Sequence, residues 1–471
     1  MRDNIKLAWR NLWRNKRRTL ITTASVFFAI FFALVMRSMQ LGAYGHMFTN
    51  AIESYTGYIQ IQHEDFWDDK TVEKVFPYSE ELNRKILKDK NVETTIKRFE
   101  SFALASSGPQ TKGVMVMGID PVNENLLSKV EERVVKYRLT DEAVEQLNKE
   151  NLPEKVKENI EIFRNTSYSN ISRLQLDLAI EDDQMEEFLP FFEKYASFKN
   201  GYIKTGEPGA LLGDRLARYL QVNVGDTLIL FGQGYHGATA AGKYEIKGIV
   251  KMPMPDIDSR IVYLPVDVCQ DLFGAENMLT SMILHLDKNG DDAVDATVKR
   301  IAGVVEKPLR VIDWKVMNEI MISQMDADNK GGMIFIAILY MVIAFGVFGT
   351  VLMMTAERRR EFGVLVAVGM QKTKLAIVMC FEMLFMGLVG IASGVIASIP
   401  VVLTGYYNPI RFSGDLGKMF EDYGMEPVMP FLWFDTYYYW QALVVLVIVL
   451  IAMIHPVKKI MKLQVINALR A

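Results

Sequence analysis

The stretch AERRREFGVLVAVGMQKTKL, residues Ala356–Leu375, decides the fold that this chain is expected to adopt. It is rich in charge, and it lies between two long apolar runs, Gly331–Met354 and Leu375–Leu403. A helix that crosses a bilayer needs about 20 apolar residues, and each run is long enough. We therefore predict two transmembrane helices joined by a short helical loop on one membrane face. Because the loop carries small residues among its charges, we interpret it as a docking surface.

Outward from this stretch, hydropathy predicts four membrane spans in the 471-residue chain. The predicted spans are residues 20–41, 333–355, 375–403 and 437–454. Basic residues precede the first span, as they precede a signal peptide. Its apolar core is too long for a signal peptide, however, and no small-residue cleavage site follows. We expect a retained helix.

Residues 42–332 separate the first two spans and are long enough for one or two soluble domains. Alternating patterns predict strands at residues 58–62, 112–119, 227–231, 243–250, 261–264 and 282–286. Residues 122–198 are charged and helical in pattern, and we interpret them as an insertion or a second subdomain. Helical stalks are expected at residues 40–54 and along an apolar stripe from Ile312 to Met321. The predicted fold class is an α-helical membrane domain of four transmembrane helices with a large mixed α/β extracytoplasmic domain between helices 1 and 2. The strand order stays open.

Lysines and arginines cluster in residues 1–19, 356–374 and 455–471. The positive-inside rule assigns these three segments to the cytoplasm, so both termini are expected there. Residues 42–332 and a shorter loop, 404–436, are then extracytoplasmic. Within residues 1–19, an apolar stripe that includes Trp9 and Trp13 beside basic residues is typical of an amphipathic helix in the membrane interface. Two roles stay open for it: an anchor that sets orientation, or a lever beside the docking loop.

The segment ERRREFGVLVAVG resembles the signature Glu-Arg-x-x-Glu-Ile-Gly-x-x-x-Ala-x-Gly of FtsX/MacB-like permeases, the membrane subunits of the mechanotransmission class of ABC transporters. The matching residues are Glu357, Arg358, Glu361, Gly363, Ala367 and Gly369, while Phe362 stands where Ile is usual. The start W-R-N-L-W-R-N-K-R-R, the four spans and the ending Ala468–Arg470 are similar too. In the family the tail commonly carries two prolines nine residues apart. Pro456 fits the first, and Val465 replaces the second.

The resemblance implies that residues 356–374 form a coupling helix seated in a groove of a cytoplasmic ABC ATPase dimer. The residues expected to contact or fit that ATPase are Glu357, Arg358, Arg359, Glu361, Gly363, Ala367 and Gly369. Charges would pair with the partner, and the small residues would permit close backbone approach. The chain has no G-x-x-x-x-G-K-[ST] phosphate loop, so no cofactor is expected in it, and ATP and Mg²⁺ are expected on the partner. The resemblance also implies a second permease, as a copy or a paralogue, beside the membrane lipids.

Glu382 is a carboxylate inside the third span. Placing a carboxylate in the membrane costs free energy, so we take a functional role as the default hypothesis. Glu382 would lie about 10 Å deep at 1.5 Å per residue. Two interpretations stay open: a snorkelling or hydrogen-bonded residue near the inner interface, or a coupling role. Gly390 and Gly394 form a G-x-x-x-G spacing that permits close helix packing.

Other motifs indicate no chemistry. Residues Gly232–Gly237 spell G-x-G-x-x-G, but a strand pattern follows, whereas dinucleotide binding requires a helix there. We predict a hairpin tip. The polar cluster at residues 63–69 is interpreted as a solvated loop, and Cys269 and Cys380 cannot build a metal site. We expect no catalytic residues, no metal site, no nucleic-acid partner and no enzymatic activity in this chain.

The transport function rests on finer resemblance. GYIQIQHEDFW, VMVMGIDP and residues 210–265 are similar to lipoprotein-releasing permeases of the LolC and LolE kind. The similarity implies extraction of lipoproteins from the bacterial inner membrane toward a periplasmic carrier. Two alternatives stay open: MacB-like efflux of periplasmic peptides or drugs, and FtsX-like signalling to a cell-wall hydrolase. The ligand of the outer domain would discriminate between them.

Overall fold

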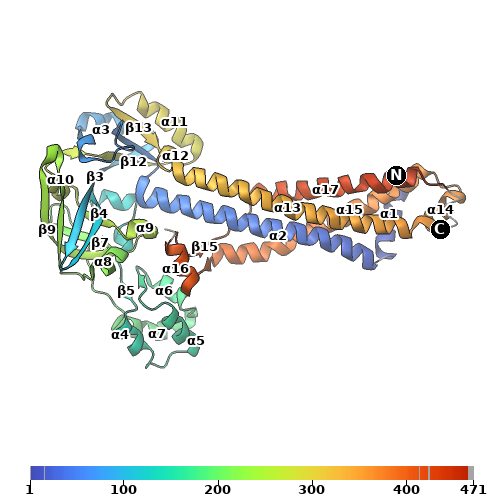
Figure 1. The fold of residues 1–471 in the computed structure, drawn as a ribbon, viewed down its shortest axis with the longest axis horizontal. Helices are drawn as coiled ribbons and strands as arrows, with labels where there is room; N and C mark the ends of the chain where they lie inside the picture. Colours follow the sequence, from blue (N-terminus) through green and yellow to red (C-terminus); the bar gives the residue numbers. More distant parts are fainter. Residues whose placement is uncertain (1, 15, 413, 423–424, 465–471) are drawn as a thin grey trace. The chain divides into compact units, whose positions relative to one another are not determined.

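The computed structural model describes residues 2–14, 16–412, 414–422 and 425–464 (Figure 1). The chain divides into two compact units. The membrane unit consists of residues 1–46, 323–410 and 428–471, and the α/β unit of residues 47–322 and 411–427. Val465 and the ending Ala468–Arg470, which belong to the family resemblance, lie outside the described residues.

The membrane unit is built from helices (Figure 1). They are α1 (Arg2–Arg14), α2 (Lys16–Ala51), α13 (Glu319–Glu357), α14 (Arg359–Ala367), α15 (Lys372–Tyr407) and α17 (Tyr437–Met461). Within the described part of the chain, four helical segments are long and apolar enough to cross a membrane, namely Thr19–Thr56, Glu319–Glu357, Lys372–Tyr407 and Tyr437–Met461. The prediction of four apolar helices is confirmed.

Apolar side chains from all of these helices contribute to the core of the membrane unit. Ile30 of α2, Val351 of α13, Met383 of α15 and Val449 of α17 are all buried in it. Polar contacts support the same packing, since Ser38 of α2 donates its hydroxyl to the carbonyl of Leu432, 2.7 Å away.

The α/β unit contains a nine-stranded sheet with the order β13-β1-β12-β3-β4-β10-β7-β9-β8. Its strands are β1 (Ile59–His63), β3 (Val92–Ser107), β4 (Gln110–Ile119), β7 (Gly209–Gly213), β8 (Thr227–Gln233), β9 (Thr239–Val250), β10 (Ile261–Pro265), β12 (Ser281–Leu286) and β13 (Leu309–Asp313). An additional pairing of β3 with β8 closes six of them into a barrel. Strand β3 pairs first with β12 and then with β4 and β8. It therefore belongs to both the open and the closed part of the sheet.

Separate apolar clusters pack on this sheet. Alternate residues of β3 and β8, such as Ala103, Ala105, Leu228 and Leu230, fill the barrel. A second cluster packs Ile59 and Ile61 of β1 with side chains of β12 and of helix α11 (Asp291–Ala302). The remaining short elements are β2 (Phe76–Pro77), α3 (Glu80–Ile86), α8 (Asp214–Leu220), α9 (Pro255–Asp258), α10 (Val266–Phe273), β11 (Met278–Leu279), α12 (Trp314–Met317), β14 (Ile410–Arg411) and β15 (Val428–Met429).

All six predicted strand segments are strands in the structure. The hairpin prediction for Gly232–Gly237 is also confirmed, because these residues join β8 to the antiparallel β9. Strands β3, β7 and β13 were not predicted. The helical stripe that was expected to begin at Ile312 is wrong at that residue, since Ile312 pairs with Gln60 in the sheet. The helix begins two residues later, where the Asp313 side chain caps it by accepting from the amide of Val316.

The helical insertion has a core of its own. Its helices are α4 (Asp141–Leu147), α5 (Glu154–Ile162), α6 (Ile171–Asp177) and α7 (Asp182–Tyr195), beside a small pair of strands, β5 (Tyr137–Arg138) and β6 (Ser167–Tyr168). Val144, Ile160, Leu174 and Phe192, one from each helix, are fully buried together. The insertion is therefore a small helical subdomain that packs within itself.

Candidate coupling site

Helix α14 is a separate short helix because the backbone breaks at both of its ends. Arg358 leaves the helical conformation, with φ −89° and ψ 6°. At the other end, Gly369 has φ +105°, a conformation that side-chain-bearing residues rarely adopt. The amide of Met370 then donates to the carbonyl of Leu365 at 3.0 Å and closes the turn into α15. Gly369 is thus needed for its backbone conformation, and a Cβ there would meet nothing within 4 Å.

A buried ion pair joins this segment to the third span. The Arg358 guanidinium Nη1 lies 2.6 Å from Oε2 of Glu382, and the two side chains are 8% and 3% exposed. The Asn11 amide of α1 donates to the other oxygen of the same carboxylate. One carboxylate in α15 therefore holds both α1 and the start of α14.

Glu361 extends this set of polar contacts toward the surface. Its Oε2 accepts from Arg14 Nη2 of α1 at 3.1 Å and from Arg358 Nε at 3.3 Å. The Glu361 side chain is half exposed, so this end of the network meets solvent. We name the five side chains the coupling network: Asn11, Arg14, Arg358, Glu361 and Glu382.

Helix α1 is also held to α15 by ring packing. The Trp9 and Phe385 rings lie edge to face with centroids 5.6 Å apart, a favourable aromatic geometry. Leu12 is buried in the core of the membrane unit. Apolar packing on one face and the coupling network on the other fix α1 against the third span.

Much of the surface of α14 is exposed. Five exposed residues of α14 and of the position directly after it are basic or apolar, namely Arg359, Arg360, Val364, Leu365 and Val368, and the acidic Glu361 is exposed among them. Val368 is 84% exposed. We name these five residues the α14 face. Apolar side chains grouped with charges on one short helix are typical of a protein-binding surface.

The structure separates the residues predicted from the signature into two groups. Arg358 and Glu361 lie in the coupling network, and Gly363 is buried beside Phe362. Glu357, Arg359 and Ala367 are exposed. Arg358 was expected to pair with a charge on the partner, but its guanidinium is buried against Glu382.

Gly390 and Gly394 line the contact between α15 and α2. A Cβ added at Gly390 would lie 2.7 Å from Cβ of Val26, and one at Gly394 would lie 2.8 Å from the carbonyl oxygen of Phe27. Both distances are too short for real atoms, so these glycines allow the helices their close approach. They serve helix packing and not the coupling network.

Sequence reasoning missed Asn11 and Arg14 as members of this site. The available signal was their place on the polar face of the N-terminal amphipathic segment. The sequence places the apolar stripe of this segment in the membrane interface and leaves a lever role beside the docking loop open, but only the fold brings Asn11 within reach of a residue 371 positions away.

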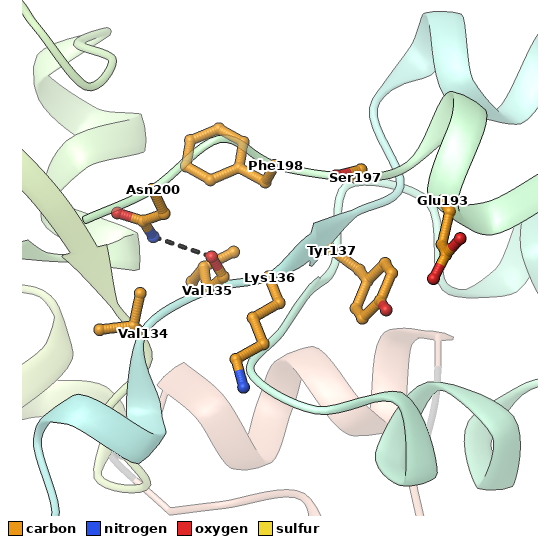
Figure 2. Close-up of a pocket in the computed structure, with 8 residues that line it drawn as sticks. All are labelled: Val134, Val135, Lys136, Tyr137, Glu193, Ser197, Phe198 and Asn200. Atoms are coloured by element: carbon orange, nitrogen blue, oxygen red, sulfur yellow. Dashed lines mark hydrogen bonds between the residues drawn. The ribbon is translucent and has the colours of Figure 1, made fainter. Parts of the chain in front are cut away.

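The α/β unit contains a pocket of about 400 Å³ beside the strand that enters the insertion (Figure 2). Its lining residues are Val134, Val135, Lys136, Tyr137, Glu193, Ser197, Phe198 and Asn200. The side-chain amide of Asn200 donates a hydrogen bond to the backbone carbonyl of Val135 at 2.8 Å. Lys136 and Glu193 are exposed. The described residues include no group of three or more His, Cys, Asp or Glu that could hold a metal ion.

Residues 333–465, which contain α14, most of α13, α15 and Glu382, match the model of the FtsX-like permease C-terminal region. Over these residues the chain is similar to the FtsX-like permeases. The family resemblance predicted from the α14 segment is confirmed.

Among curated relatives, the permease is similar to the lipoprotein-releasing system transmembrane protein LolC of Xylella fastidiosa strain Temecula1, with 24% identity over 210 residues. This match covers 43% of the chain and 49% of LolC. An uncharacterised ABC transporter permease of Methanocaldococcus jannaschii is 27% identical over 162 residues, 33% of the chain and 40% of that protein. The chain thus matches about half or less of the length of these relatives.

Two solved structures resemble parts of the permease. One is the extracellular domain of the transporter YknZ from Gram-positive bacteria, with TM-score 0.28 and 11% identity, covering 55% of the chain and all of that domain. The other is the periplasmic region of MacB from Actinobacillus actinomycetemcomitans, with TM-score 0.30 and 10% identity, covering 58% of the chain and 97% of that region.

Proposed function

We propose that the permease is the membrane subunit of an ATP-driven ABC transporter, in which α14 docks a separate cytoplasmic ATPase dimer and passes its movement to α1 and α15. The observation that carries this proposal is that α14 both presents exposed residues and is joined to the third span. Its outer side presents the α14 face, and its inner end is joined to the third span by the coupling network. ATP and Mg²⁺ belong to the partner.

The coupling network supplies the physical reason that movement is transmitted. A buried carboxylate left without its partner costs about 3–5 kcal/mol, so the Arg358–Glu382 pair resists separation. When the ATPase displaces α14, Glu382 and the third span follow. Asn11 binds the same carboxylate, so α1 follows as well. In this proposal α1 acts as a lever and not only as an anchor.

The proposed topology places residues 1–19, 356–374 and 455–471 in the cytoplasm of a bacterium and the α/β unit outside. The permease would work in the inner membrane beside a second permease, which is either a copy or a paralogue. Movement of the spans would then reach the α/β unit through α2 and α13, whose chains continue into it.

The proposed cargo is an acylated lipoprotein, extracted from the membrane toward a soluble carrier. Support comes from the LolC relative, which is named as part of a lipoprotein-releasing system. The test is reconstitution of the purified complex in lipid discs with an acylated lipoprotein. ATP-dependent appearance of the lipoprotein in the soluble fraction is expected. Retention of the lipoprotein at full ATP turnover would exclude this cargo.

The docking role is tested by Val368→Glu, which puts a negative charge at the most exposed apolar residue of the α14 face. We expect the variant to fold, because Val368 packs on almost nothing, and to lose at least tenfold in co-purified ATPase. A matched control is Val122→Glu in the α/β unit, where the side chain is 72% exposed. Equal ATPase recovery from both variants would overturn the docking role of α14.

A further inference from the structure

The loop between α15 and α17 contains a small closed structure. Helix α16 (Gly414–Asp422) occupies its middle. The Phe412 amide donates to the carbonyl of Pro427 at 2.9 Å and closes the loop at its base. The Phe412 ring stacks on that of Phe420 with centroids 4.6 Å apart. The described residues among 411–427, namely 411, 412, 414–422 and 425–427, belong to the α/β unit although they lie between two spans, and we name them the return loop.

The return loop contacts the helical insertion through complementary charges. Helix α6 carries Arg173 and Asp177 four residues apart, hence on one face of the helix. The return loop carries a charge of the opposite sign for each of them. Arg173 forms an ion pair with Glu426, and Asp177 forms one with Arg411.

A third contact adds the end of the first long helix. The Asn50 amide of α2 donates to Oε2 of Glu426 at 3.1 Å. Glu426 therefore receives donors from both α2 and the insertion. The side chains of Glu426 and Asp177 are only 12% and 9% exposed, so both acids depend on these partners.

The contact is polar, which bears on whether it can open. The apolar side of α6 packs into the core of the insertion, where Leu174 is fully buried. Burial and the nearby positive charge of Arg173 lower the pKa of Arg411 to about 10. The two arginines thus repel each other across the contact. Small polar interfaces between parts of a chain commonly move.

We propose that the return loop is a latch on the helical insertion, closed in this structure and opened during each ATP-driven cycle. This inference rests on the proposed function, because the cycle supplies the movement. The return loop is continuous with α15 and α17, so the displacement of these spans would draw Glu426 and Arg411 away from α6. The insertion would then be free to move while α2 and α13 hold the rest of the α/β unit.

The test is cross-linking of Arg173→Cys with Glu426→Cys in a full-length chain that carries Cys269→Ala and Cys380→Ala. A short bifunctional maleimide is the appropriate reagent. The Cα–Cα distance of an arginine–glutamate ion pair is generally longer than the Cα–Cα distance that a disulfide allows. The matched control is Arg164→Cys with Asp141→Cys. That pair forms a 2.9 Å ion pair inside the insertion and has no reason to open.

In native membranes without ATP, we expect most chains to cross-link at both pairs. During ATP turnover the 173–426 yield should fall at least threefold, while the 141–164 yield stays constant. A low resting yield at 173–426, or a yield that ATP does not change, would overturn the latch. An ATP-sensitive yield in a complex that releases no lipoprotein would leave the latch standing and count against the cargo alone.

Discussion

At the scale of single residues, the most informative side chain is Glu382. The sequence marks it as functional because a carboxylate inside an apolar span needs a reason to be there. Its partners could not be predicted, since Asn11 and Arg358 come from other parts of the chain and reach it only after folding. The structure shows that Glu382 is hydrogen-bonded to Asn11 and Arg358. Its coupling role stays a proposal.

Replacing Arg358 by alanine should destabilise the permease by about 3–5 kcal/mol, because Glu382 is left buried and unpaired. Thermal unfolding in detergent measures the effect. Arg359→Ala is the matched control, since Arg359 is exposed, and it should change stability by less than about 0.5 kcal/mol. The double variant Arg358→Met/Glu382→Met should be more stable than Arg358→Ala. A double variant that is no better would show that the pair is not the source of the loss.

A second residue-scale prediction concerns Asp258 of the α/β unit. Burial, followed by the negative charge of Asp214, raises the pKa of Asp258 from 3.8 to about 6. Between about pH 4 and pH 6 the folded state keeps a proton that the unfolded state releases. Stability from this group is therefore present at pH 4 and is lost as the pH rises to 6.

The measurement is thermal unfolding of wild type and Asp258→Asn across this range. The amides of Arg215 and Met252 donate to the Asp258 carboxyl, so the asparagine keeps an acceptor for one of them. From pH 4 to pH 7 the wild type should lose about 3 kcal/mol relative to the variant, the equivalent of a shift of about 2 pKa units. Parallel curves would show that Asp258 titrates normally.

At the scale of elements, helices and strands whose hydrophobic pattern is uniform along the segment were predicted. Elements whose pattern changes along the segment were missed. The four apolar helices follow from hydropathy alone, and strands such as β8 from simple alternation. Strand β3 was missed because its 16 residues change partners, which makes its burial irregular. Strand β13 was taken for helix because its apolar residues run directly into those of α12.

The packing of α15 on α2 gives the prediction at this scale. Gly390→Ala should lower stability by about 1–3 kcal/mol, because the new Cβ would lie 2.7 Å from Val26 and push the helices apart. Gly349→Ala in α13 is the control, since a Cβ there meets nothing within 4 Å. Thermal unfolding of both variants measures the difference. Equal stability of the two would show that close approach at Gly390 is not required.

At the scale of the whole molecule, the sequence predicted one or two soluble domains between the first two spans and a shorter extracytoplasmic loop between the last two. The structure assigns residues 411–427 of that loop to the α/β unit. No local pattern could predict this, because the contact depends on charges at Arg173 and Asp177 about 250 residues earlier in the chain. The separate helical insertion was predicted from its composition, and its own core explains why composition sufficed.

The central claim is that α14 seats an ATPase, and the most direct test is photo-cross-linking from position 368. A photoreactive side chain replaces Val368 in the permease in its native membrane, and mass spectrometry identifies the polypeptide attached to it. The same side chain at position 122 of the α/β unit is the control. We predict that position 368 attaches to a protein with a G-x-x-x-x-G-K-[ST] phosphate loop and that position 122 does not. The absence of an ATPase adduct at 368, with the complex intact, would contradict the account.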